Sequence, residues 1–203
     1  MIISIDTFSD NFGITIIKDH KVLANISLLK QKPFSEVLIK EIDRLFKEME
    51  ILPQMITKVI VNKGPGSMTG LKVGISVAKS FAYVNNIPLY SYISLDVMAY
   101  KYRFFKGRLI SAINAGKSQV FFREYITTMT TIIPMHEIKV IKVEDLQKYI
   151  SDNKLIVTKN LDLEGINIVK ILDSLSLDGA LYSLKHKTEE NIFKLEPLYI
   201  NNP

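Results

Sequence analysis

Apolar and polar residues in the first thirty positions are arranged as expected for β-strands. Residues 2–5 form a short apolar run that ends at Asp6, which is typical of a buried strand. Residues 13–17 and 22–26 are mainly apolar and flank a polar turn, a pattern that predicts a β-hairpin. The sequence therefore predicts three consecutive antiparallel strands.

Helical spacing of apolar residues follows in two segments. In residues 35–49 apolar side chains recur every three or four positions, with Ser35 placed to cap the start and Pro53 after the end. Residues 69–84 predict a second helix. Its polar residues form one narrow stripe: Lys72, Ser76, Lys79, Ser80 and Tyr83. So narrow a stripe predicts burial around most of the helix, against its own sheet and a further surface.

Strand and helix patterns alternate through the rest of the chain. We expect strands at residues 58–61, 88–92, 109–113, 120–125, 138–141 and 155–158. We expect helices at residues 95–102, 143–150, 166–175 and 178–184. This order indicates the α/β class. Each half begins with strands followed by a helix, which suggests an old duplication with halves at residues 1–103 and 104–203.

Length and composition fit an ordinary globular protein. The chain has 203 residues, 47% of them hydrophobic, which suits one large domain or two small ones. The absence of cysteine excludes disulfides, a thiol nucleophile and a cysteine zinc site. No apolar run approaches the roughly 18 residues of a membrane span, and no signal peptide pattern precedes the first strand. We expect a cytosolic protein without a membrane partner.

The net charge of +5 permits contact with an acidic partner such as RNA. The basic residues are nearly all lysines, and we favour a compositional origin for this charge over a nucleic-acid surface. We expect no run of basic and aromatic residues of the kind that forms a stacking platform.

The segment KGPGSMTGLKVG, residues 63–74, leads from a predicted strand into a predicted helix. Such a loop can bind phosphate through free backbone N–H groups, with Gly64, Gly66 and Gly70 supplying the geometry. It matches neither the dinucleotide fingerprint nor the P-loop, which ends in Gly-Lys-Ser/Thr. Gly70 and Gly74 also lie on one helix face, where small residues allow another helix to approach closely. We favour close packing over phosphate binding.

Asp6 is a second candidate, because a carboxylate at a strand end can reach a metal–phosphate pair. No glycine follows it until Gly13, however, so the loop lacks the backbone freedom typical of an ATP-cradling hairpin. The alternative is that Asp6 accepts hydrogen bonds from neighbouring loop N–H groups. Residues 115–118, Ala-Gly-Lys-Ser, resemble the end of a P-loop only by chance, and we expect a turn between strands there.

The histidines argue against hydrolase chemistry. His20, His136 and His186 are far apart in sequence and show no metal-binding spacing, so a zinc hydrolase is disfavoured. A Ser-His-Asp triad stays open from sequence alone, although the GxSxG nucleophile elbow is missing.

Residues 63–79 resemble the GPGSFTGLRxGxxxAK signature of the bacterial TsaB family, also called YeaZ. Met68 replaces the signature phenylalanine and Lys72 replaces its arginine. Residues 5–7, Ile-Asp-Thr, resemble the opening strand of that family, and residues 197–200, Pro-Leu-Tyr-Ile, its closing motif. The glycine signature is specific, and the order and spacing of the other two reinforce it.

The resemblance implies the actin-like ATPase fold (ASKHA, ribonuclease H-like), with two related α/β halves and mixed sheets flanked by helices. It implies a non-catalytic subunit that forms a heterodimer with a TsaD-like catalytic subunit and works with a TsaE-like ATPase. That complex transfers a threonylcarbamoyl group to an adenosine beside the tRNA anticodon, so the chain meets tRNA indirectly. Alone, members of the family pair with a second copy.

The resemblance also implies roles for particular residues. The helix after the glycine loop belongs to the half that meets the partner. Six of its residues are expected to divide between core and interface: Gly70, Leu71, Gly74, Ile75, Ala78 and Phe81. Lys72 and Lys79 are expected to line the rim of that interface. The chain itself is expected to hold no cofactor and no metal. ATP or ADP at the subunit interface stays open, and the residues nearest to such a nucleotide would be Asp6, Gly64, Gly66 and Ser67.

Two departures from the family pattern weaken any catalytic interpretation. Residues 34–36 read Phe-Ser-Glu where the family often has His-Ser-Glu, so this chain is further from binding metal. Residues 114–116 read Asn-Ala-Gly where the family has Asp-Ala-Arg, so a carboxylate is missing. The alternative function is a small-molecule kinase or ATPase of the same fold, which would use Asp6 and the Gly64–Gly70 loop. A peptidase is the least favoured of the three.

Overall fold

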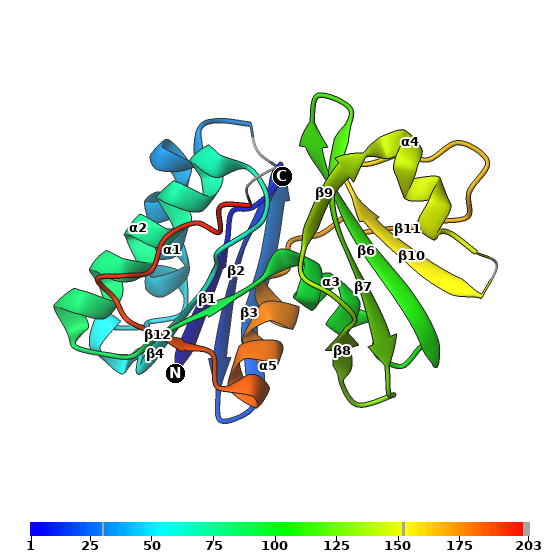
Figure 1. Cartoon of the computed structure of the whole chain (residues 1–203). Helices are drawn as coiled ribbons and strands as arrows, with labels where there is room; N and C mark the ends of the chain where they lie inside the picture. Colours follow the sequence, from blue (N-terminus) through cyan, green and yellow to red (C-terminus); the bar gives the residue numbers. More distant parts are fainter. Residues whose placement is uncertain (30, 152, 201–203) are drawn as a thin grey trace.

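The first of two β-sheets contains the N-terminal hairpin. The computed structural model describes residues 1–29, 31–151 and 153–200 (Figure 1). Within these residues the first sheet has the strand order β12-β5-β4-β1-β2-β3. Its strands are β1 Ile2–Asp6, β2 Asn11–Lys18, β3 Lys21–Leu29, β4 Lys58–Asn62, β5 Leu89–Tyr92 and β12 Glu189–Glu190. The first three are antiparallel, as predicted, and β4 and β5 run parallel to β1.

The second sheet is built from the later strands, in the order β11-β10-β6-β7-β8, with β9 also paired to β7. Its strands are β6 Gly107–Gly116, β7 Gln119–Thr127, β8 Ile132–Pro134, β9 Lys139–Lys142, β10 Lys154–Lys159 and β11 Val169–Lys170. β6 and β7 form an antiparallel hairpin, and β10 runs parallel to β6. Both sheets are therefore mixed, as the expected fold class requires.

Helices cover both sheets in layers (Figure 1). Their bounds are α1 Phe34–Glu48, α2 Met68–Asn85, α3 Ser94–Lys101, α4 Val143–Leu146 and α5 Ser176–His186, with single 3₁₀ turns at Pro53–Met55 and Gln147–Tyr149. α1 and α2 lie on the outer face of the first sheet, and α3 and α5 lie between the two sheets. α4 packs on the outer side of the second sheet.

Alternation along the strands gives each face of a sheet its own apolar core. Ile3 and Ile5 of β1 point to the core beneath α1 and α2, together with Val59 and Val61 of β4. Ile60, between these two valines, joins the core that fills the space between the sheets. A third, smaller core lies between the second sheet and α4. The site described below is thus carried by two helices anchored on a fully buried sheet face.

Two predictions about helices were wrong. α1 begins one residue before Ser35, after Pro33, and no side chain caps it. Phe34 is buried against Phe12, with ring centroids 5.7 Å apart, and this contact places Phe34 in the first turn.

The second error concerns residues 166–175, which form no helix. β11 pairs there with β10, and the Ile171 N–H donates to the Thr158 carbonyl at 2.8 Å. Pairing with the open edge of β10 therefore outweighs the helical spacing of the apolar residues.

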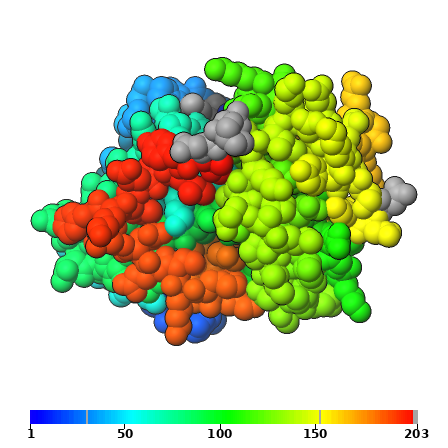
Figure 2. All heavy atoms as spheres, viewed as in Figure 1, coloured from blue at the N-terminus to red at the C-terminus, as the bar shows by residue number. Residues whose placement is uncertain are grey.

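The C-terminal segment returns to the first sheet. α5 packs on β1, β2, β4 and β5, and β12 pairs with β5. Figure 2 shows the orange and red atoms of this segment across the front of the half that contains the first sheet. The proposed division at residues 103 and 104 stays a prediction. It divides the strands β1–β5 from β6–β11, while α5 and β12 lie with the first group.

Candidate functional site

Asn62 anchors the loop that joins β4 to α2. Its side-chain oxygen accepts hydrogen bonds from the Gly64 N–H at 2.8 Å and from the Ser94 hydroxyl at 2.9 Å. Its side-chain amide donates to the Asp6 carboxylate at 2.9 Å. Asn62 is fully buried, so these bonds are shielded from water and fix the loop. The sequence analysis did not single out Asn62 as a functional residue. Its position could have indicated such a role, because it is a polar residue at the end of an apolar strand.

The glycines of the loop and of α2 pack against the segment after β1. A Cβ atom on Gly66 would lie 2.4 Å from the Phe8 carbonyl oxygen, and one on Gly70 would lie 2.1 Å from the Thr7 carbonyl oxygen. One on Gly74 would lie 2.3 Å from the Thr7 hydroxyl. Side chains are therefore excluded at these positions, because backbone carbonyls approach Gly66 and Gly70 and the Thr7 side chain approaches Gly74 too closely. The close approach predicted for Gly70 and Gly74 is real. Gly70 lies against both the Thr7 carbonyl and the Phe34 ring of α1, whereas the neighbour of Gly74 is Thr7 alone.

Three N–H groups of the loop and the first turn of α2 already have protein acceptors. The Ser67 N–H donates to the Phe8 carbonyl at 2.7 Å, and the Gly70 N–H donates to the Ser67 hydroxyl at 3.4 Å. The Gly64 N–H donates to the side-chain oxygen of Asn62. This pattern supports the packing interpretation of the loop, in which Ser67 acts as the N-cap of α2.

Asp6 faces the protein interior and is fully buried. Its carboxylate accepts hydrogen bonds from the Asn62 amide, from the Leu175 N–H at 2.5 Å and from the Phe8 N–H at 3.4 Å. Burial nevertheless raises the pKa of Asp6 to about 6, because the charged form is poorly solvated there. Asp6 thus joins β1, the glycine loop and the start of α5, as in the hydrogen-bonding alternative considered above.

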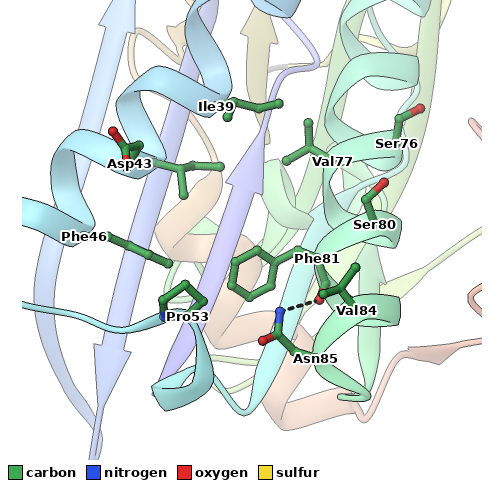
Figure 3. A pocket seen from close by; sticks show the side chains of 11 residues that line it. Ile39, Asp43, Phe46, Pro53, Ser76, Val77, Ser80, Phe81, Val84 and Asn85 are labelled. Atoms are coloured by element: carbon green, nitrogen blue, oxygen red, sulfur yellow. Dashed lines mark hydrogen bonds between the residues drawn. The ribbon is translucent and has the colours of Figure 1, made fainter.

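A mainly apolar groove of about 620 Å³ lies between α1 and α2 (Figure 3). Ile39 and Val77 point toward one another across it, and Phe46, Pro53, Phe81 and Val84 line its remaining length. The rings of Phe46 and Phe81 meet edge to face, with centroids 6.0 Å apart. Asp43 is the one charged residue of this lining.

The groove exposes apolar side chains that a monomer would normally bury. Ile39 is 62% exposed and Val84 is 79% exposed. A second hollow of about 320 Å³ continues along the same seam toward the first turns of both helices and is lined by Leu38, Lys72 and Val73. The seam is long, apolar and open, which is typical of a surface that another protein covers.

The residues predicted to bind a partner are divided between the core and this seam. Five of the eight are buried in the structure: Gly70, Leu71, Gly74, Ile75 and Ala78. Phe81 and Lys72 line the two hollows. Lys79 turns toward the C-terminal segment, where its ammonium group donates to the Leu195 carbonyl at 3.2 Å. The exposed residues that sequence analysis missed are Ile39 and Val84, apolar side chains that lie off the buried stripe of each helix.

The remaining candidates do not assemble into a site. Among the described residues no group of three or more His, Cys, Asp or Glu side chains could hold a metal ion. Lys117 and Ser118 form the turn of the β6–β7 hairpin with positive φ, which confirms the predicted turn at residues 115–118. No helix within the described ranges is long and apolar enough to cross a membrane.

The chain is similar to a known protein family and to named bacterial proteins. Residues 21–192 match the family model "TsaD: tRNA N6-adenosine threonylcarbamoyltransferase". The chain is 31% identical over 120 residues to the tRNA threonylcarbamoyladenosine biosynthesis protein TsaB of Bacillus subtilis, an alignment that covers 59% of this chain and 52% of the relative. It is 26% identical over 163 residues to the protein of the same name in Buchnera aphidicola subsp. Schizaphis graminum, with 77% of each chain covered. The match thus spans about half the length of the first relative.

A solved structure shows the same fold over the whole chain. YeaZ from Pseudomonas aeruginosa superposes with a TM-score of 0.80 and covers 98% of this chain and 99% of its own, at 15% sequence identity. This similarity confirms the expected fold class with its two α/β halves.

Proposed function

The chain belongs to the family of the tRNA N6-adenosine threonylcarbamoyltransferase TsaD, and we propose from this that it acts as a TsaB-type subunit in the biosynthesis of threonylcarbamoyladenosine in tRNA. In this role it binds a TsaD-like catalytic subunit and activates it, without making or breaking a bond itself. The tRNA N6-adenosine threonylcarbamoyltransferases of Streptococcus suis and Tropheryma whipplei are 30% and 32% identical to the chain, each over 44% of its length, which is consistent with two subunits of related fold.

The open seam between α1 and α2 is the observation that carries this proposal. Apolar surface that stays in water is unfavourable by about 25 cal/mol per Å². Ile39, Val77 and Val84 supply such surface on two rigid helices, beside a single carboxylate, Asp43. A partner that covers the seam with its own apolar helices gains this free energy without reorganising the chain.

The interior position of Asp6 supports a non-catalytic role. A catalytic carboxylate has to reach its substrate, whereas Asp6 is enclosed and bonded to Asn62, Phe8 and Leu175. Under this proposal the chain alone holds no nucleotide, and any ATP or ADP of the complex lies at the interface with the partner. Titration of the purified chain with magnesium-ATP tests this part directly.

The same seam also serves self-association of the chain. A second copy of the chain covers it when the TsaD-like subunit is absent, and the TsaD-like subunit displaces that copy. A TsaE-like ATPase joins the assembled pair. Tenfold dilution series on a sizing column distinguish a weak self-association from the tighter heterodimer.

Size-exclusion chromatography with the TsaD-like subunit of the same organism tests the main proposal. The wild-type chain is expected to co-elute with it and to raise threonylcarbamoyl transfer to adenosine in tRNA. Ile39→Glu and Val84→Glu place a charge in the seam and should abolish co-elution. Both positions are largely exposed, so the variants should remain folded. Leu172→Glu, which changes an equally exposed apolar residue outside the seam, is the matched control and should bind normally.

Two results would contradict the proposal. One is co-elution that survives in both folded seam variants, because the partner must then bind elsewhere. The other is ATP turnover or peptide cleavage by the isolated chain at enzymatic rates, which would favour the kinase, ATPase or peptidase alternatives.

A further inference from the structure

Residues 101–108 read Lys-Tyr-Arg-Phe-Phe-Lys-Gly-Arg, a run that interleaves basic and aromatic side chains. The expectation that the chain contains no such run was therefore wrong. The segment leaves α3 and enters β6, away from the seam between α1 and α2. We propose that it is a direct binding surface for single-stranded RNA, an inference that rests on the proposed role in tRNA modification.

Lys106 and Arg108 carry the solvent-exposed positive charge of this segment. Both side chains are exposed, and neither makes an ion pair within the described part of the chain. By contrast, Lys101 is paired with Asp178 at 2.7 Å. Unpaired cations on one surface attract phosphates, because each contact releases counterions from the nucleic acid.

These two cations border a hollow of about 720 Å³ at the start of β6. Phe105 and Gly107 line it from the same segment, and Lys154 lines it from the start of β10. The Lys154 ammonium group is held by the Glu124 carboxylate at 2.6 Å, which leaves Lys106 and Arg108 as the charges available to a ligand here. A concave surface with cations on its rim suits a sugar–phosphate backbone.

Aromatic rings beside these cations are exposed. Phe104 is 61% exposed and Phe105 is 37% exposed. The guanidinium group of Arg103 lies over the Phe104 ring at 4.3 Å from its centroid and over the Tyr100 ring at 4.2 Å. An exposed ring next to a stacked arginine is a surface on which an unpaired base can stack. This favours RNA over an acidic protein, which would require the cations alone.

The segment is held in place before any ligand binds. The Thr127 hydroxyl donates to the Phe105 carbonyl and accepts a hydrogen bond from the Gly107 N–H at 3.2 Å. The Arg103 carbonyl accepts from the Met129 N–H at 3.1 Å, and its side chain donates to the Tyr100 carbonyl at 2.9 Å. A prearranged surface gives up less conformational entropy when it binds.

Fluorescence anisotropy with a labelled, unstructured RNA oligonucleotide tests the proposal on the full chain. We expect Lys106→Glu combined with Arg108→Glu to weaken binding about tenfold or more. The same variant should lower the salt-dependence slope by about 1.4, or about 0.7 for each phosphate that the protein no longer neutralises. Phe104→Ala should weaken binding of single-stranded RNA about fivefold or more and leave binding of a fully paired RNA duplex unchanged.

A charge-matched control separates this surface from general attraction. Lys40→Glu combined with Lys117→Glu changes the net charge equally, at exposed lysines on α1 and on the β6–β7 turn. This control should retain most of the RNA affinity. The wild-type chain, the surface variant and the control should all co-elute with the TsaD-like subunit and melt at similar temperatures.

The proposal is overturned if the wild-type chain does not bind the oligonucleotide, or if the surface variant and the control lose affinity equally. It is also overturned if the surface variant keeps RNA but loses the TsaD-like subunit, since the patch would then contact an acidic protein. Selective loss of RNA in a chain that binds no TsaD-like subunit would support the RNA surface and refute the proposed function.

Discussion

The side-chain amide of Asn62 donates a hydrogen bond to the carboxylate of Asp6 at 2.9 Å, and both side chains are fully buried. This contact joins the end of β4 to the end of β1 at the point where the glycine loop begins. The same carboxylate holds the start of α5 through the Leu175 N–H. Asp6 is therefore a structural junction, and its ionisation is linked to the stability of the fold.

Stability should fall as pH rises through the range in which Asp6 ionises. Burial raises its pKa from 3.8 to about 6, so the folded state retains a proton that the unfolded state releases. The stabilisation is complete below the unfolded pKa and is lost as pH rises through the folded pKa. A shift of about two pKa units corresponds to about 3 kcal/mol. Urea denaturation between about pH 4 and about pH 7 measures this loss.

Asp6→Asn should remove this contribution to the pH slope, because the amide does not ionise. At low pH it should cost about 1–3 kcal/mol, since an NH₂ group replaces an acceptor used by buried donors. The difference from the wild type should narrow toward neutral pH. Asp10→Asn, at an exposed neighbouring position, should leave the Asp6 slope in place. An unchanged slope in Asp6→Asn would show that another group is responsible.

Gly74→Ala should destabilise the fold by about 1–3 kcal/mol, because the added methyl group collides with the Thr7 hydroxyl 2.3 Å away. Thr7→Ala alone should cost about 1 kcal/mol, since the Thr7 hydroxyl donates to the Gly70 carbonyl at 2.8 Å. The double variant should be more stable than the sum of both changes predicts. Thermal melts of the four proteins form a double-mutant cycle, and strict additivity would refute the collision.

A charge introduced on the buried face of α2 should destabilise the fold, whereas a charge on its exposed face should not. Ile75 is 3% exposed, so Ile75→Glu buries an unpaired carboxylate and should unfold the protein or cost several kcal/mol. Val84→Glu should change stability by no more than about 0.5 kcal/mol, because that side chain already meets water. Circular dichroism melts distinguish the two. A folded Ile75→Glu variant would contradict this prediction, because the glutamate would then have to reach water from the buried face of α2.

A buried network between α3 and β7 predicts a destabilisation caused by loss of charge pairing. The Asp96 carboxylate accepts hydrogen bonds from the Tyr125 hydroxyl at 2.7 Å and from the Arg123 guanidinium at 3.1 Å. Arg123→Ala should cost about 3–5 kcal/mol, because it leaves the carboxylate without its cation. Tyr125→Phe should cost about 1.5–3 kcal/mol, the range for a hydrogen bond to a charged group. Urea midpoints in the reverse order would contradict this assignment.

Hydrophobic periodicity predicted most of the strands and helices, because it reports which side of an element is buried. The N-terminal hairpin and α2 agree with their predictions to within a few residues. The helix expected at residues 166–175 failed because the edge of β10 supplied backbone partners that no local pattern reveals. The capping expectation for Ser35 failed because burial of Phe34 moved the helix start.

The candidate site was less accessible to sequence reasoning. The glycine motif correctly indicated close packing, but its contact with Thr7 and Phe8 depends on the β1–β2 loop folding over the start of α2. The exposed residues of the seam, Ile39 and Val84, became visible only when α1 and α2 were placed side by side. Apolar periodicity identifies the buried stripe of each helix, but it does not predict which of the remaining faces binds another protein.

The return of the chain to its first sheet bears on how the protein is made. β12 completes the sheet that begins with residue 2 and α5 covers it, so a ribosome has to synthesise the chain through residue 190 before that sheet can close. Until then, the underside of β1 and β4 lacks its covering helix and presents apolar surface to chaperones. Removing residues 174–203 would consequently damage the N-terminal half first, although these residues are far from that half in sequence.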